Sequence, residues 1–141
     1  FANRAKSARS GQLQDRACTA GTNDREVIRK ILAKIADAQM ADLILTIDGI
    51  GCREEELVPE ATKAVVDKEI PGIGESMRLF MTRTRKRAML TRGTAGIRGK
   101  SLIVNLPGSP KAVKESLEYV LPHLGHGLGI LRGTDGECGN S

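Results

Sequence analysis

Aromatic side chains are almost absent from this sequence of 141 residues, which contains no Trp, one Tyr and two Phe. Proteins that bind single-stranded nucleic acid stack its bases on aromatic rings. The sequence also has no apolar run approaching the roughly 18–20 residues of a membrane-spanning helix. We therefore expect neither a nucleic-acid partner nor a membrane span.

Paired cysteines are also lacking. The chain has three cysteines, Cys18, Cys52 and Cys138, which lie far apart and show no Cys-x-x-Cys spacing. An odd number of scattered cysteines, without a signal-peptide pattern at the N-terminus, predicts free thiols in a reducing, cytoplasmic setting. The net charge of +5 suits an anionic partner but does not identify one.

Helical patterns alternate with short buried strands along the chain. Asn23 and Glu26 have capping-box spacing, and apolar residues recur at helical spacing as far as residue 35, which predicts a helix. Residues 42–47 and 101–106 are nearly continuous apolar runs, typical of strands covered on both faces. Further helices are predicted at 60–68, 72–82 and 110–121.

This order predicts a three-layer α/β/α fold around a central, mostly parallel sheet. The length suits one domain, residues 1–141. Residues 1–22 lack usable periodicity, so we expect a loop or poorly ordered chain there, and we expect 132–141 to be a tail. Glycines weaken the predicted helix beyond residue 124, and a neighbouring subunit is expected to cover the apolar residues Leu121, Leu124, Leu128, Ile130 and Leu131.

Two loops that follow the buried strands are candidates for a ligand site. The first is IDGIG (47–51) and the second is NLPGSPKA (105–112). If the strands are parallel, both loops lie at carboxyl ends of strands, where open α/β sheets bind ligands near a helix N-terminus. Taken alone, each loop is better explained as a simple tight turn.

A third glycine-rich segment, TAGIRGKS (94–101), superficially matches a phosphate-binding P-loop. That pattern requires Gly where Thr94 stands, and it requires a helix after Lys-Ser, whereas a strand is predicted there. A β-turn between two strands is the favoured interpretation.

Several longer segments together carry a family resemblance over about residues 23–131. They are LILTIDGIG (43–51), VPEAT (58–62), PGIGESMR (71–78), AMLTRGTAGIRG (88–99) and LIVNLPGSPKAVKESLEYVLPHL (102–124). These segments resemble the molybdopterin adenylyltransferase family, which includes bacterial molybdenum-cofactor proteins and the corresponding domain of gephyrin. The resemblance implies a three-layer α/β domain, usually a homotrimer, that acts in molybdenum cofactor biosynthesis. Catalytic members use Mg-ATP to adenylylate the terminal phosphate of molybdopterin, so the implied ligands are molybdopterin, ATP and Mg²⁺.

The resemblance also implies which residues form the site. In this family the two strand-end loops line one pocket. The catalytic candidates are Asn23, Asp24 and Glu56, and no metal ligand is assigned. The implied substrate-binding residues are Thr46, Asp48, Gly49, Gly51, Pro59, Glu60, Glu75, Arg78, Asn105, Pro107, Gly108 and Ser109. For Glu75 and Arg78, a surface ion pair is an equally favoured role.

The sequence departs from the family pattern at key positions. The family's Thr-Gly-Gly-Thr-Gly appears as Ile-Asp-Gly-Ile-Gly, so Asp48 adds a negative charge where backbone should meet an anionic ligand. Glu56 stands in place of the family's Asp. Asn23 replaces another acid and cannot supply the negative charge that helps to hold Mg²⁺. The alternative function is therefore a non-catalytic module that binds pterin or nucleotide or serves in assembly.

A second departure lies near the N-terminus. Family members have a strand, a loop, a helix and another strand before the position that matches residue 23, and here GQLQDR (11–16) resembles only the loop. A fragment, a chain with missing segments joined, and a divergent member are all compatible with this pattern.

Two further clusters have weaker interpretations. A solvated surface is the favoured role of the basic run, ahead of attraction of ligand phosphates and of nucleic-acid binding. The basic run comprises Arg83, Arg85, Lys86, Arg87 and Arg92. His123 and His126 lack an acid or thiol at metal-site spacing, so surface or subunit-contact roles are favoured over zinc binding.

Overall fold

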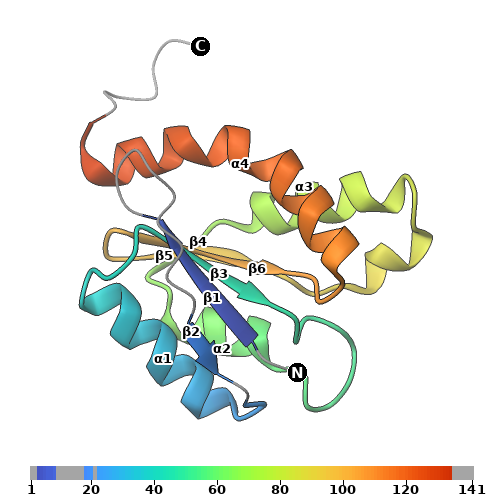
Figure 1. The fold of residues 1–141 in the computed structure, drawn as a ribbon, viewed down its shortest axis with the longest axis horizontal. Coiled ribbons are helices and arrows are strands. Elements are labelled where there is room, and N and C mark those ends of the chain that lie inside the picture. The colour runs from blue at the N-terminus through green and yellow to red at the C-terminus, as the bar shows by residue number, and fades with distance from the viewer. Residues whose placement is uncertain (1–2, 9–17, 21, 135–141) are drawn as a thin grey trace.

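One mixed sheet forms the centre of the fold. The computed structural model describes residues 3–8, 18–20 and 22–134, and within these ranges six strands pair in the order β2–β1–β3–β6–β5–β4 (Figure 1). The strands are β1 (Asn3–Ala8), β2 (Cys18–Ala20), β3 (Leu43–Ile47), β4 (Lys68–Glu69), β5 (Ala95–Arg98) and β6 (Ser101–Leu106).

Strand direction corrects one expectation. The central strands β3 and β6 are parallel, with Leu43 opposite Leu102 and Ile47 opposite Leu106. The other neighbours, β1–β2, β1–β3, β4–β5 and β5–β6, are antiparallel. The sheet is therefore mixed rather than mostly parallel, in part because β5 and β6 form a hairpin and strands joined by so short a turn must be antiparallel.

That hairpin explains the segment TAGIRGKS. β5 ends at Arg98, β6 begins at Ser101, and Gly99 adopts φ +57° in the turn between them. A strand, not a helix, follows Lys100. The β-turn interpretation is confirmed.

Helices cover both faces of the sheet and confirm the three-layer fold (Figure 1). One face is covered by α1 (Arg25–Asp37) and α2 (Val58–Val65), the other by α3 (Pro71–Thr82) and α4 (Pro110–Arg132), and the 3₁₀ helix η1 (Lys86–Leu90) follows α3. Successive strand side chains point to opposite faces. Ile44 and Ile103 accordingly pack with α1 and α2, whereas Leu45 and Val104 pack with α3 and α4.

Helix starts follow from local chemistry. Pro71 and Pro110 occupy the first turns of α3 and α4, where the missing proline N–H costs nothing. Asp24, not Asn23, caps α1: its carboxylate accepts hydrogen bonds from the N–H groups of Glu26 at 2.8 Å and Val27 at 3.3 Å. This corrects the predicted cap by one residue.

The N-terminal region differs from the predicted loop. Residues 3–8 form β1, which pairs with both β2 and β3, so β3 is not left as an open edge of the sheet. The expectation of irregular chain over 1–22 is therefore wrong for 3–8 and 18–20. The GQLQDR segment (11–16) lies outside the described residues.

The C-terminal helix is longer than predicted. α4 continues to Arg132 and ends at Gly133, which adopts φ +71°. Leu124 is buried in the core between α4 and the sheet, and Leu121, Leu128 and Leu131 pack against that core. These leucines are thus buried or partly buried by their own chain, which corrects the argument that a neighbouring subunit covers them, whereas Ile130 remains 40% exposed. Most of the predicted tail, 135–141, lies outside the described residues. None of the described helices is long and apolar enough to span a membrane.

Candidate ligand-binding site

Two loops meet where β3 and β6 end. The strands are parallel and in register, so their last residues, Ile47 and Leu106, lie opposite each other. The N–H of Asp48 donates to the carbonyl of Leu106 at 3.1 Å, which ties the start of one loop to the start of the other. The structure thus brings together the two loops that the sequence singled out.

An open cleft of about 640 Å³ lies at these loops. The predicted residues that line it are Asn23, Asp48, Gly49, Glu56, Gly108 and Ser109. Arg53, Glu55 and Pro110 line it too, and the sequence analysis did not select them. A cleft of this size can hold a small organic ligand with phosphate groups.

The Pro-Gly-Ser-Pro loop presents the start of α4 to the cleft. Ser109 is the N-cap, and its Oγ accepts a hydrogen bond from the N–H of Ala112 at 3.2 Å. Gly108 and Ser109 are exposed. The N-terminal end of a helix carries partial positive charge and unpaired N–H groups, so this side of the cleft favours an anion.

The opposite side of the cleft carries negative charge. Asp48 directly follows β3 and adopts φ +79°, a left-handed conformation that favours glycine. Glu55 and Glu56 line the same cleft, and among the described residues Arg53 is the one basic side chain that lines it. The cleft therefore combines a helix N-terminus and one arginine with three carboxylates.

Glu56 is held within its own loop. Its carboxylate accepts a hydrogen bond from the N–H of Arg53 at 2.9 Å. A Cβ at Gly51 would collide with the same carboxylate and push it aside. Gly51 itself does not line the cleft. Its contribution is to let Glu56 fold back over the loop.

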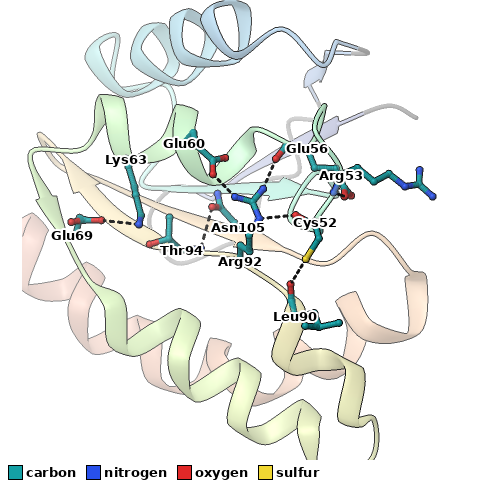
Figure 2. Close-up of polar contacts among 11 residues, drawn as sticks. Cys52, Arg53, Glu56, Glu60, Lys63, Glu69, Leu90, Arg92, Thr94 and Asn105 are labelled. Carbon is teal, nitrogen blue, oxygen red and sulfur yellow. Dashed lines mark hydrogen bonds and ion pairs between the residues drawn. The ribbon is translucent and has the colours of Figure 1, made fainter.

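Arg92, which does not line the cleft, holds the loop that contains Gly51 and Glu56 (Figure 2). Its Nε donates to the carbonyl of Gly51 at 2.6 Å, Nη2 donates to the carbonyl of Glu56, and Nη1 forms an ion pair with Glu60. Its backbone N–H donates to the carbonyl of Ile50 at 2.8 Å. The solvated role proposed for the basic run is therefore wrong for Arg92. Its structural role could have been inferred from the sequence, because Arg92 lies in the matching segment AMLTRGTAGIRG, whereas the other residues of the basic run precede that segment.

A buried polar network accounts for two predicted substrate-binding residues. Asn105 is fully buried; its Nδ2 donates to the hydroxyls of Thr46 and Thr62, each at 2.9 Å, and its Oδ1 accepts from the N–H of Thr94 at 3.2 Å. All of these groups are satisfied by one another. Thr46 and Asn105 thus join β3, β6 and α2 beneath the cleft and do not line it.

The remaining predicted residues are not among those that line the cleft. Arg78 donates to the carbonyls of Gly93 at 2.7 Å and Thr91 at 3.4 Å. It lines a cavity of about 10 Å³ together with Pro107 and Asn105, which leaves space for no more than a single water. The other residues outside the cleft are Asp24, Pro59, Glu60 and Glu75, of which Glu75 is exposed and Pro59 buried.

Together these features define a three-layer α/β domain with a ligand cleft at the carboxyl ends of two parallel central strands, the usual binding place in such sheets. Residues 8–126 match the model of the family described as "Probable molybdopterin binding domain". The chain belongs to this family, and the resemblance seen in the sequence is confirmed.

Curated relatives agree with this assignment. The chain is 42% identical over 112 residues to a protein of Helicobacter pylori (strain J99) named molybdopterin adenylyltransferase, covering 79% of this chain and 64% of the relative. It is 44% identical over 98 residues to a protein of the same name from Haemophilus influenzae, covering 70% of this chain and 50% of the relative. The chain thus covers less than two thirds of the length of these relatives.

Solved structures show the same fold. The molybdopterin biosynthesis enzyme MoaB from Thermus thermophilus is similar with a TM-score of 0.73 and 48% identity, over 79% of this chain and 70% of that one. The molybdopterin biosynthesis Mog protein from Mycobacterium ulcerans is similar with a TM-score of 0.72 and 35% identity, over 75% of this chain and 69% of that one.

Proposed function

We propose that this domain acts in molybdenum cofactor biosynthesis by binding molybdopterin in the cleft and adenylylating its terminal phosphate with Mg-ATP. The observation that carries the proposal is the meeting of the Asp48–Gly49 loop with Gly108 and Ser109 at the start of α4. Relatives named molybdopterin adenylyltransferase support the reaction.

The chain's own residues have distinct parts in this proposal. The backbone at Gly108 and Ser109 lets a phosphate approach the positive end of α4. Arg53, exposed at the cleft, attracts phosphate oxygens. In the transfer, a phosphate oxygen of molybdopterin bonds to the α-phosphorus of ATP, and the bond from that phosphorus to the departing pyrophosphate breaks.

The carboxylates of the cleft fit a magnesium ion that arrives with ATP. Among the described residues, no group of three His, Cys, Asp or Glu is placed to hold a metal ion by itself. Mg²⁺ commonly keeps several waters and needs one or two carboxylates besides substrate phosphates. Asp48 and Glu56, both at the cleft, can supply these. The bound ion would offset phosphate charge during transfer.

A non-catalytic role in binding is the second candidate, and Asn23 favours it. This residue lines the cleft but carries no charge, and Asp48 adds a charge that opposes an anionic ligand. A protein of this kind would bind molybdopterin without releasing pyrophosphate from ATP.

One pair of measurements separates the candidates. Titration of the protein with molybdopterin tests binding, and pyrophosphate release from Mg-ATP with and without molybdopterin tests transfer. Binding together with molybdopterin-dependent release supports the adenylyltransferase, and binding alone supports the second candidate. Absence of binding contradicts both.

The proposal includes a homotrimer in the cytoplasm, as the family resemblance implies. Large apolar side chains that are more than half exposed lie on α3 and η1, namely Leu79, Met89 and Leu90. Their burial between subunits would stabilise an oligomer. Sedimentation equilibrium at micromolar concentration should therefore give the mass of three chains, and a clean monomer would contradict the trimer.

A further inference from the structure

We propose that Arg92 is a positioning residue for the cleft, because it holds the irregular segment 50–57 in the shape that presents Glu56 to the ligand. The inference rests on the proposed function. It adds a residue that lies outside the cleft and acts on it through another residue.

The contacts of Arg92 converge on this segment (Figure 2). The guanidinium reaches the carbonyls of Gly51 and Glu56 with two different nitrogens, and the backbone N–H reaches the carbonyl of Ile50. A guanidinium is planar and presents its N–H groups in a fixed fork. The distance between the carbonyls of Gly51 and Glu56 is therefore set by the geometry of one side chain.

The segment depends on these contacts for its order. Residues 50–56 are irregular chain with bends and a turn between β3 and α2, and Leu57 is the N-cap of α2. Within the segment the N–H of Glu56 donates to the carbonyl of Arg53 at 3.1 Å, and Sγ of Cys52 donates to the carbonyl of Leu90 at 3.3 Å. Irregular segments with few backbone hydrogen bonds open more easily than strands or helices. Arg92 supplies bonds at both ends of the segment, and its ion pair with Glu60 anchors the guanidinium to the first turn of α2.

The link from Arg92 to the cleft is short. The same residue, Glu56, offers its backbone carbonyl to Arg92 and its side chain to the cleft. A shift of this carbonyl moves the carboxylate. Misplacement of a reacting group by about 1 Å can lower a rate by about 100-fold.

Lysine is the informative replacement. Arg92→Lys keeps the positive charge and the backbone bond to Ile50, but one ammonium cannot span Gly51, Glu56 and Glu60 as the fork does. Arg87→Lys is the matched control, since Arg87 is an exposed member of the same basic run. The expected result for Arg92→Lys is a fall in kcat of about 10- to 100-fold with a clearly smaller rise in molybdopterin Kd, since Arg53 lies in the same segment. The control should match the parent.

A double-variant cycle tests whether Arg92 acts through Glu56. In a Glu56→Gln background, Arg92→Lys should cause little further loss of kcat, because the positioned carboxylate is already gone. A general structural defect would instead lower kcat by the same factor in both backgrounds, and that result would overturn the inference. If kcat of Glu56→Gln is too low to measure, the comparison of kcat with Kd in Arg92→Lys decides.

Amide hydrogen exchange tests the same idea without any activity. In Arg92→Lys, the N–H groups of Arg53 and Glu56, which donate hydrogen bonds within the segment, should exchange at least about tenfold faster while β3 and β6 keep the parent's protection. Unchanged exchange of these two N–H groups, or unchanged kcat, overturns the positioning role. If Arg92→Lys shows the expected faster exchange but the parent protein releases no pyrophosphate, the result contradicts the proposed function and not the positioning role. The two failures are therefore distinguishable.

Discussion

A Cβ atom added to Gly108 would lie 2.5 Å from Oδ1 of Asp48, so the loop after β6 packs directly against the side chain that begins the loop after β3. Real Cβ atoms do not approach oxygen so closely. A side chain at Gly108 would therefore force the Asp48 side chain to move. Because Asp48 also has φ +79°, this contact combines a close approach with a conformation that glycine would adopt more easily.

Asp48→Gly should stabilise the fold and improve binding of an anionic ligand. Glycine adopts the left-handed conformation without its steric cost of about 1–2 kcal/mol, whereas the greater freedom of glycine in the unfolded chain costs about 0.5–1 kcal/mol. The free energy of unfolding should therefore rise by up to roughly 1.5 kcal/mol. Urea denaturation measures this change. Asp48→Asn keeps a side chain and removes only the charge, so tighter molybdopterin binding in both variants would identify charge as the obstacle. A loss of affinity in both would show that the carboxylate assists binding.

Gly108→Ala should weaken molybdopterin binding by about tenfold, or about 1.4 kcal/mol. The added methyl group meets Asp48 and narrows the approach to the start of α4. In the Asp48→Gly background the collision is absent, so part of the lost affinity should return. Gly125→Ala is the control, because a Cβ there would have no heavy atom within 4 Å. Equal molybdopterin affinity in Gly108→Ala and the parent would show that this loop is a simple turn and does not contribute to the binding site.

The strand-end loops were predictable because their strands are apolar on both faces. β6 occupies the predicted range 101–106, and β3 begins one residue after the start of the predicted 42–47. The structure pairs these two strands in parallel, which brings their carboxyl ends together. The two apolar strands are local features of the sequence, and their carboxyl ends determine where the cleft lies.

Other features depend on partners far along the chain. The sequence of β1, NRAKSA, has no strand-like apolar alternation, and its conformation comes from backbone pairing with β2 and β3. α4 continues through Gly125, Gly127 and Gly129 because packed leucines offset their poor helix propensity. The role of Arg92 was hidden for the same reason, since its bonds reach residues 32 to 42 positions away.

An ion pair away from the cleft should make stability depend on acid pH. Arg98 donates from Nε and Nη2 to the two carboxylate oxygens of Asp37, each at 2.9 Å, and from Nη1 to the carbonyl of Val65 at 2.7 Å. The hydrogen bonds from Arg98 hold the pKa of Asp37 below its ordinary value of 3.8. A carboxyl group with a lowered folded-state pKa stabilises the fold above its unfolded pKa, and this contribution is lost as pH falls through the folded value.

Asp37→Asn should therefore unfold at lower urea than the parent at about pH 6, and the difference should shrink as pH falls below about 3.8. Asn cannot ionise, so the comparison isolates the titration of one group. A difference between parent and variant that stays constant across this range would show that the carboxylate charge contributes nothing.

Asp at the two candidate catalytic positions that differ from the family pattern should raise turnover more than affinity. Asn23 and Glu56 both line the cleft, and in Asn23→Asp with Glu56→Asp each carries the acid that the family pattern has there. Carboxylates that hold a metal during phosphoryl transfer act on the transition state, so the gain should appear in kcat for pyrophosphate release rather than in molybdopterin Kd.

Each single variant serves as a control for this pair. Asn23→Asp adds a charge, whereas Glu56→Asp keeps the charge and shortens the side chain by one methylene, so the two singles separate missing charge from misplaced charge. A parent that already turns over at about 10 per second, a common enzymatic rate, would show that the departures are harmless. If the double variant gains nothing while molybdopterin still binds, the obstacle lies elsewhere in the cleft. Asp48 is then the next position to change, because its carboxylate lies against Gly108 beside the start of α4, where the phosphate is proposed to bind.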